Sequence, residues 1–310
     1  MKSKIMLFFA ILAPFLAYSQ EQGVAFGNFS FFLSPKILEE GFISDSGLGY
    51  RYNDYWGGVL RFRYTAISKN EEFGSVHDSL NAIDEKLYEL FLLPAEFSAV
   101  RTPATKIQVG LGAYYEYDIL HEKGFFNMPA LETLTPPRER VNSYTNTFSM
   151  HILGPLLEAT FNQRISLFTI TLSAGIVPIF SLHSSQHMKI VPLLAPTKAA
   201  YDQDTWGSPY FYLSIDSVIL KYVNLALLYD AARLKYKVID FDDNLAWINP
   251  ERTLFTQSFR IEASVLIPLG GDMRAQIGYG YTYDSTQIDS RTPFSSNRQY
   301  LILSARKLGF

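Results

Sequence analysis

The chain has 310 residues, of which 48% are hydrophobic, 15% aromatic and 18% charged, and its formal net charge at pH 7 is -3. The absence of a basic bias argues against nucleic acid as a partner. The absence of cysteine excludes disulfides, thiol catalysis, cysteine-ligated metals and a lipid anchor on cysteine. The charged fraction lies below the roughly 25% of soluble domains, while Phe and Tyr are abundant. We expect no cofactor and no metal.

The first 19 residues have the composition of a secretory signal peptide. Two lysines precede an uncharged apolar run over residues 5–16, and Ala17 and Ser19 put small side chains at the −3 and −1 positions of a cleavage site. The run is shorter than the roughly 20 residues of a spanning helix, which favours cleavage over an uncleaved helix. The sequence therefore predicts a signal peptide at residues 1–19 and one mature domain at residues 20–310.

Apolar and polar side chains alternate with a period of two in about twelve segments of the mature chain. The clearest is residues 273–283, in which Met, Ala, Ile and three Tyr share one face, opposite Arg, Gln, Gly and Thr. Tyrosines at one end of an apolar face are typical of a membrane interface. In chain order the segments are residues 28–33, 48–52, 60–65, 87–98, 107–118, 148–161, 168–176, 211–216, 224–230, 258–267, 273–283 and 300–310. They predict an all-β protein, a transmembrane antiparallel up-and-down β-barrel of about twelve strands.

Two of these segments carry an irregularity. At Pro94 the apolar phase shifts by one residue, which predicts a β-bulge because proline cannot donate to a strand ladder. The Gly-Pro pair at 154–155 is expected to reset the phase before Leu157. Upstream of that pair, Met150 and Ile152 are expected to face lipid.

The connections between segments alternate between short and long. The short ones are residues 53–55, 101–104, 162–164, 221–222 and 270–272, and the long ones are residues 35–45, 69–84, 121–141, 184–205, 240–251 and 285–297. Outer-membrane barrels keep short turns in the periplasm and long loops outside. Six long and five short connections require an even count of twelve strands, with both termini in the periplasm. A helical bundle is disfavoured, because its best segment, residues 165–182, is interrupted by polar residues, Gly175 and Pro178.

In its alternating segments and alternating loop lengths, the chain resembles the single-chain bacterial outer-membrane β-barrel proteins. The most specific part is residues 300–310, which look like the terminal-strand signal of that class, with Phe310 last and Leu308 two residues before it. The resemblance implies a protein embedded in outer-membrane lipid whose last strand is read by the barrel assembly machinery. Ser304 and Arg306 depart from the apolar set of that signal, which predicts a bulge near Arg306.

If the apolar faces contact lipid, the opposite faces line the lumen. The candidate pore-lining residues are the charged residues on those faces: Arg51, Arg61, Arg63, Glu89, Glu116, Asp118, Asp216, Asp230, Arg260, Glu262 and Arg274. The arginines fall on strands near the closing seam and most acids elsewhere, so opposed walls of unlike charge would orient polar solutes. Alternatively, the charges pair with one another and fill the interior. Strand count does not decide, because twelve lies between filled barrels of about eight strands and open ones of sixteen or more.

The sequence predicts a porin-like channel for the passive passage of small polar solutes. The alternative is a non-conducting structural or adhesin-like barrel whose long extracellular loops bind a partner. An enzyme is not expected. The run His183-Ser184-Ser185 is similar to the His-x-Ser arrangement of outer-membrane phospholipases, but Pro196 and Thr197 stand where that group has its amide partner. A polar loop edge is the preferred interpretation of this run.

Overall fold

The computed structural model describes residues 29–53, 55–73, 79–126, 142–191, 197–207, 209–237, 240–241, 247–248, 250–270, 273–289 and 294–307. The predicted signal peptide and Phe310 lie outside these residues. The long strands are β1 (Phe29–Leu38), β2 (Gly41–Arg51), β3 (Trp56–Phe73), β4 (Ser79–Arg101), β5 (Thr105–Phe126), β6 (Asn142–Ile165), β7 (Phe168–Val177), β8 (Phe180–Val191), β9 (Thr197–Gly207), β10 (Tyr210–Ile219), β11 (Val223–Lys237), β14 (Glu251–Gly270), β15 (Met273–Ile288) and β16 (Phe294–Lys307). Two-residue strands β12 (Asp240–Phe241) and β13 (Trp247–Ile248) pair with each other.

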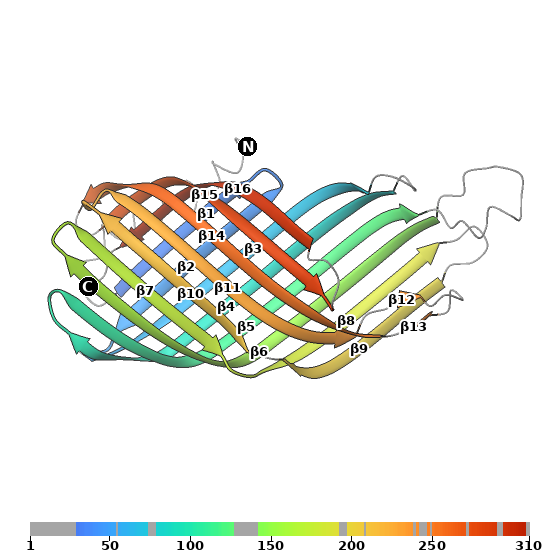
Figure 1. Ribbon diagram of the computed structural model, residues 1–310, viewed down its shortest axis with the longest axis horizontal. Coiled ribbons are helices and arrows are strands. Elements are labelled where there is room, and N and C mark those ends of the chain that lie inside the picture. Colours follow the sequence, from blue (N-terminus) through green and yellow to red (C-terminus); the bar gives the residue numbers. More distant parts are fainter. Residues whose placement is uncertain are drawn as a thin grey trace, which may run out of the picture.

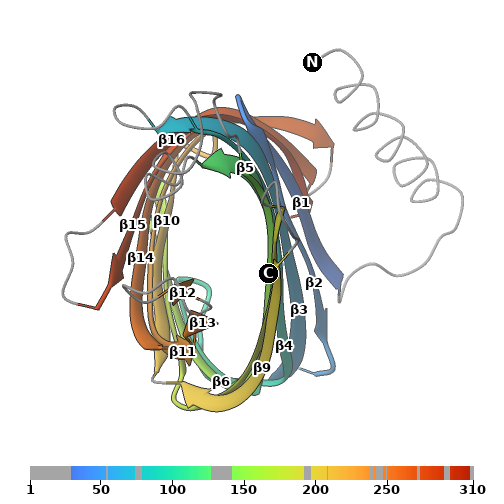
Figure 2. The same cartoon turned by 90° about the vertical axis from the view of Figure 1, so that its right-hand side faces the viewer.

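The strands close into an antiparallel barrel (Figure 1). The ring runs from β1 through β7 to β10, β11, β14, β15 and β16, and β16 pairs with β1, so that twelve strands form the wall. Beyond a short break, β8 continues β7 and pairs with β6. In the same way β9 leads into β10 and pairs with β8. The predicted fold and strand count are therefore confirmed. Viewed along its axis, the barrel is oval, which brings the wall containing β3 close to the wall containing β10 (Figure 2).

The outer surface is apolar on the side of the short turns. Leu225, Ile261, Val265, Ile277 and Leu301 are all between 43% and 54% exposed, although each belongs to the alternating apolar set of its strand. Such exposure of large aliphatic side chains over neighbouring strands is unfavourable in water and expected in lipid. The lipid-facing phase predicted for these strands is therefore correct.

On the outer face, a row of tyrosine and histidine rings crosses neighbouring strands of the wall. Tyr64, Tyr88, Tyr117, His151 and His183 stand directly opposite one another on β3, β4, β5, β6 and β8. Successive ring centroids lie 4.9, 5.9, 4.4 and 5.9 Å apart. On β6 the outward residues that precede His151 are polar, so the apolar belt of that strand ends at this row, where amphipathic rings are favoured.

The strands are longer than the sequence predicted, and several expected loops are strand. In particular, β1 and β2 are joined only by Glu39 and Glu40, and Pro35 pairs with Ser44 inside the ladder. Proline is tolerated there because β1 does not pair with β16 at positions 34 and 35. The strands β4, β5, β6, β8 and β9 extend well past the end of the β1–β2 hairpin, at the right-hand end of Figure 1. The wall is therefore much taller on one side.

The expected bulge at Pro94 is confirmed, since the register of β4 against β5 shifts between Leu92 and Ala95. The other two irregularities are absent. The register of β6 against β5 is continuous across positions 154–155, so no phase reset occurs. The register of β16 against β15 is continuous through Lys307, so the bulge near Arg306 is wrong.

The lipid-facing assignment of the first half of β6 is also wrong. Met150 and Ile152 are buried on the inner face, whereas Leu153 is 54% exposed on the outer face. This half of β6 approaches the aromatic row and passes beyond it, where the outer face no longer needs apolar side chains. Among the described residues, no helix is long and apolar enough to cross a membrane, and the disfavoured helical segment is β7 with the start of β8.

Candidate functional site

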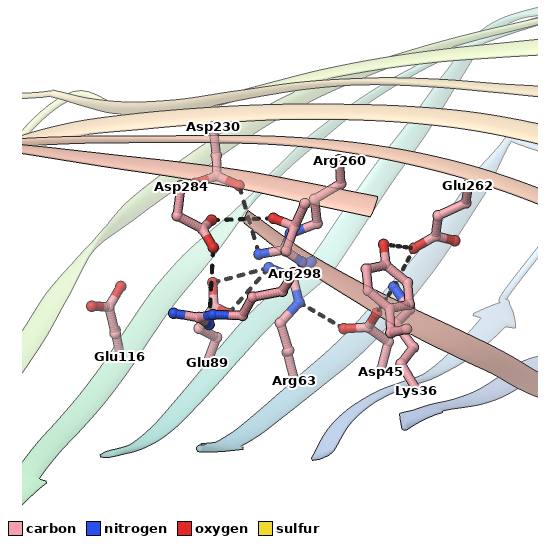
Figure 3. A network of polar contacts seen from close by, with 12 residues as sticks. Lys36, Asp45, Arg63, Glu89, Glu116, Asp230, Arg260, Glu262, Asp284 and Arg298 are labelled. Atoms are coloured by element: carbon pink, nitrogen blue, oxygen red, sulfur yellow. Dashed lines mark hydrogen bonds and ion pairs between the residues drawn. The ribbon is translucent and has the colours of Figure 1, made fainter. Parts of the chain in front are cut away.

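The inner face carries a network of ion pairs centred on Arg63 of β3 (Figure 3). Its Nε lies 2.6 Å from Asp45 Oδ1 and its Nη1 lies 3.1 Å from Glu89 Oε2. Asp45 is shared with Lys36, whose Nζ lies 2.7 Å from Asp45 Oδ2 and 2.6 Å from Glu262 Oε1. These side chains are at most 16% exposed, so they form a buried chain in which carboxylates and cations alternate.

A looser set of charges flanks this chain (Figure 3). Arg260 Nη2 lies 4.0 Å from Asp230 Oδ2, and Arg298 Nη1 lies 3.9 Å from Asp284 Oδ2. These separations are too long for direct hydrogen bonds. The flanking groups therefore attract one another while keeping the capacity to bind another polar group.

Arg61 bridges the narrow dimension of the oval. Its Nη2 donates to the Tyr212 hydroxyl at 2.8 Å and forms an ion pair with Glu158, to which the Tyr212 hydroxyl also donates. The three residues belong to β3, β10 and β6, and β3 and β10 are separated by four intervening strands of the ring. Gly175 lets the Tyr212 ring lie against the wall, because a Cβ there would be 2.2 Å from the ring. We call Arg61, Glu158 and Tyr212 the cross-lumen bridge.

Apolar side chains fill the lumen next to the cross-lumen bridge. The Arg61 guanidinium carbon lies 5.1 Å from the centroid of the Phe91 ring, and the Tyr114 and Tyr210 rings stack at 5.1 Å. The buried cluster comprises Phe91, Leu93, Tyr114, Met150, Ile152, Leu156, Val177, Phe180, Leu182, Tyr210, Tyr212 and Leu234. The inward apolar residues of β6 therefore pack with those of β4, β5, β10 and β11 and narrow the interior.

Two cavities with charged linings lie among the described residues of the inner face. One, of about 290 Å³, is lined by charged side chains of the network, including Arg63, Asp230 and Arg260. The other, of about 730 Å³, opens among the short turns and is lined by Arg164 and Arg274, among others. Phe32 lines both, so we describe the larger cavity as a vestibule and the smaller as the charged cavity.

An antiparallel ring without free edges, an apolar outer belt and a charged interior occur together only where a sheet closes in a membrane. The structure is that of an outer-membrane β-barrel.

Solved structures of similar fold include two bacterial transport proteins. The translocator domain of autotransporter NalP from Neisseria meningitidis shares 8% identity over 99% of this chain and 96% of that chain, with a TM-score of 0.44. The toluene transporter TodX from Pseudomonas putida shares 9% identity over 90% of this chain and 89% of that chain, with a TM-score of 0.49. The outer membrane protease OmpT from Escherichia coli shares 9% identity over 92% and 94% of the two chains, with a TM-score of 0.32. No protein-family model and no curated protein sequence matches the chain. These likenesses assign no activity to the barrel.

The barrel places the remaining sequence-predicted charges in different surroundings. Glu116 accepts a hydrogen bond from Tyr114, and Asp216 accepts one from Asn224 Nδ2 at 3.3 Å. Asp118 is half-buried and stands opposite Met150 on the inner face.

Two predicted arginines lie at the vestibule end. Arg274 lines the vestibule and donates to the Met273 carbonyl at 2.9 Å. Arg51 is the last residue of β2 and is half-buried at the rim. That these residues, with the network around Arg63, line an open passage stays a prediction.

The expected separation of arginines and acids onto opposed walls is wrong. Arg63 pairs with acids of both adjacent strands, so opposite charges interleave within one wall. Lys36 and Asp45 were not predicted from the sequence, because residues 35–45 were expected to form a loop. Glu158 was not predicted either, although the apolar phase of Leu157 and Ala159 implies its inward position.

The His183-Ser184-Ser185 run lies in strand β8 and not at a loop edge. His183 faces outward, where its Nδ1 and Nε2 lie 2.9 Å from Asp204 Oδ1 and 3.3 Å from Asp202 Oδ1. Ser185, the hydroxyl of the His-x-Ser arrangement, lies on the same outward face and hydrogen-bonds Ser149 Oγ at 2.8 Å. His183 and Ser185 therefore contact other partners and not each other, whereas a catalytic base must hydrogen-bond its nucleophile. The described residues contain no group of three or more His, Asp or Glu able to hold a metal ion.

Proposed function

We propose that this barrel lets small polar solutes pass passively across the outer membrane through a lumen that the cross-lumen bridge narrows. The observation that carries the proposal is the pair of cavities that share Phe32 in their linings and contain charged side chains, beside a bridge made of side chains. Side chains rotate far faster than a folded wall rearranges, so such a constriction limits the size of a solute without sealing the barrel permanently.

The charged lining supports passage of polar solutes in preference to hydrocarbons. Paired charges at a constriction bind and orient polar groups while leaving no net charge to trap an ion. The vestibule adds Arg164 and Arg274 at its entrance, which favours the approach of anionic or dipolar solutes.

Swelling of liposomes containing the refolded barrel tests this proposal. We expect swelling in small solutes such as glycine and glycerol, little swelling in disaccharides, and several-fold faster swelling for Arg61→Ser, which removes the bridge. Arg252→Ser is the matched control, because Arg252 pairs with Asp289 at 3.0 Å on β14, away from the bridge. Folded protein that gives no swelling, with or without Arg61, would refute the proposal.

The alternative of a non-conducting barrel that binds a partner is supported by a separate observation. The strands β4, β5, β6, β8 and β9 project beyond the rest of the wall (Figure 1). Within this projection Tyr144 donates to Glu122 at 2.6 Å, and burial together with that hydrogen bond raises the pKa of the Tyr144 phenol above its ordinary value. The projection is therefore an ordered surface that a partner could contact. A folded Arg61→Ser variant that gives no liposome swelling would favour this alternative.

We also propose export through residues 1–19 and recognition of the last strand, ending at Phe310, by the barrel assembly machinery. Mass spectrometry of the mature protein should give an N-terminus near Gln20. Deletion of Phe310 should lower the amount of heat-modifiable, folded protein in the outer membrane, whereas an unchanged amount would contradict the recognition of this strand.

A further inference from the structure

The charged cavity is electrically balanced. Four cationic and four acidic side chains of the described residues line its 290 Å³, among them Arg61, Arg260 and Asp230. Aromatic side chains, including Phe91 and Tyr210, form part of the same lining. A wall with equal numbers of both charges discriminates poorly between free anions and free cations, and favours a ligand that carries both.

Three buried polar atoms of this lining lack a hydrogen-bond partner among the described residues. They are Arg61 Nε, Arg260 Nη1 and Asp230 Oδ2. Lys36 and Arg63, in contrast, are each engaged with two carboxylates. Buried polar atoms without a hydrogen bond are costly even where the rest of the side chain is paired, so water or a ligand is expected at these three atoms.

The spacing between the charged groups of Arg260 and Asp230 suits one chemical class. Arg260 Nη2 and Asp230 Oδ2 are 4.0 Å apart on the adjacent strands β14 and β11. An α-amino acid carries its ammonium and carboxylate on one carbon, so it presents two opposite charges at a similarly short separation. The cavity holds about ten water molecules at roughly 30 Å³ each, which is enough for a small amino acid.

We propose that the charged cavity binds a small zwitterionic α-amino acid. The ligand carboxylate accepts from Arg260 Nη1 and Arg61 Nε, the ligand ammonium donates to Asp230, and the aromatic wall receives the side chain. This proposal rests on the proposed function, because it names the class of solute that the passage takes.

Calorimetric titration of the refolded full-length barrel in detergent tests the site with three probes of similar size. They are L-alanine, L-lactate, which lacks the ammonium, and ethylamine, which lacks the carboxylate. Losing one charged hydrogen bond should weaken binding about tenfold or more. We expect saturable binding of L-alanine and at least that loss for both other probes. Equal or non-saturating heats for all three would mean that the cavity holds water only, and would overturn the proposal.

Two variants assign the site to the named residues. Arg260→Gln and Asp230→Asn should each weaken L-alanine binding about tenfold, while Arg252→Gln, eight residues away on the same face of β14, should leave it unchanged. Unchanged binding in folded Arg260→Gln or Asp230→Asn protein would overturn the assignment. If these variants fail to fold, the comparison of three probes on the unmodified barrel still decides.

Liposome swelling separates this inference from the proposed function. Binding of L-alanine without swelling in any solute would uphold the site and refute passage. Swelling that follows solute size alone, without saturable binding, would uphold passage and refute the site.

Discussion

Replacing Ile277 with arginine tests the placement of the barrel in lipid. Ile277 is 49% exposed on the outer face of β15, four residues beyond Met273 and six before Tyr283. Ten residues at about 3.4 Å each, tilted by about 45°, span roughly 24 Å, close to the apolar band of an outer-membrane barrel. Ile277 then lies near the bilayer midplane, where arginine costs about 2–4 kcal/mol. This cost lowers the folding equilibrium constant by about 30- to 1000-fold.

Denaturant titration of folding into lipid vesicles, read by heat-modifiable gel mobility, measures this change. Asn297→Arg is the matched control, because Asn297 is exposed on the outer face of β16 and pairs with Tyr283, at the far end of the apolar face of β15. At an interface the same substitution should cost about 0–1 kcal/mol. Equal costs at the two positions, or no cost at Ile277, would mean that the outer belt does not face lipid.

Three further predictions follow from single positions. Arg63→Gln removes the guanidinium between Asp45 and Glu89 and should destabilise the barrel by about 3–5 kcal/mol in the same titration; a loss below about 1 kcal/mol would show that the network is not buried. Lys221→Gly should stabilise by about 1 kcal/mol, because Lys221 has φ of 66° in a tight turn, and a loss of stability would contradict that backbone conformation. Arg274→Glu should shift the reversal potential toward cation selectivity, and an unchanged potential would place Arg274 away from the path of ions.

The contact with lipid allowed the outer face of this barrel to be predicted from the sequence. Every large side chain that faces hydrocarbon must be apolar, so the alternation in residues 258–267 and 273–283 gives both strand and orientation. The same rule misplaced Met150 and Ile152, because the outer face of β6 there leaves the membrane and the apolar residues turn inward. Alternation alone does not reveal which face meets lipid.

The contacts between side chains inside the barrel were not predicted from the sequence, because they depend on how the ring of strands closes. Arg61 and Glu158 are 97 residues apart and meet because the barrel is oval (Figure 2). Lys36 and Asp45 were assigned to a loop, since the sequence does not show that β1 leaves Pro35 unpaired toward β16. The charged set was identified by phase, but its pairing required the three-dimensional arrangement.

Single-channel conductance in planar bilayers measures whether this lumen is open, with Arg61→Ser compared against the unmodified barrel. We predict discrete steps from both proteins, with larger steps from Arg61→Ser because the cross-lumen bridge is gone. Arg252→Ser should behave like the unmodified barrel. The absence of steps from both the unmodified barrel and Arg61→Ser, when heat-modifiable mobility shows that they are folded, would contradict a passage through this lumen.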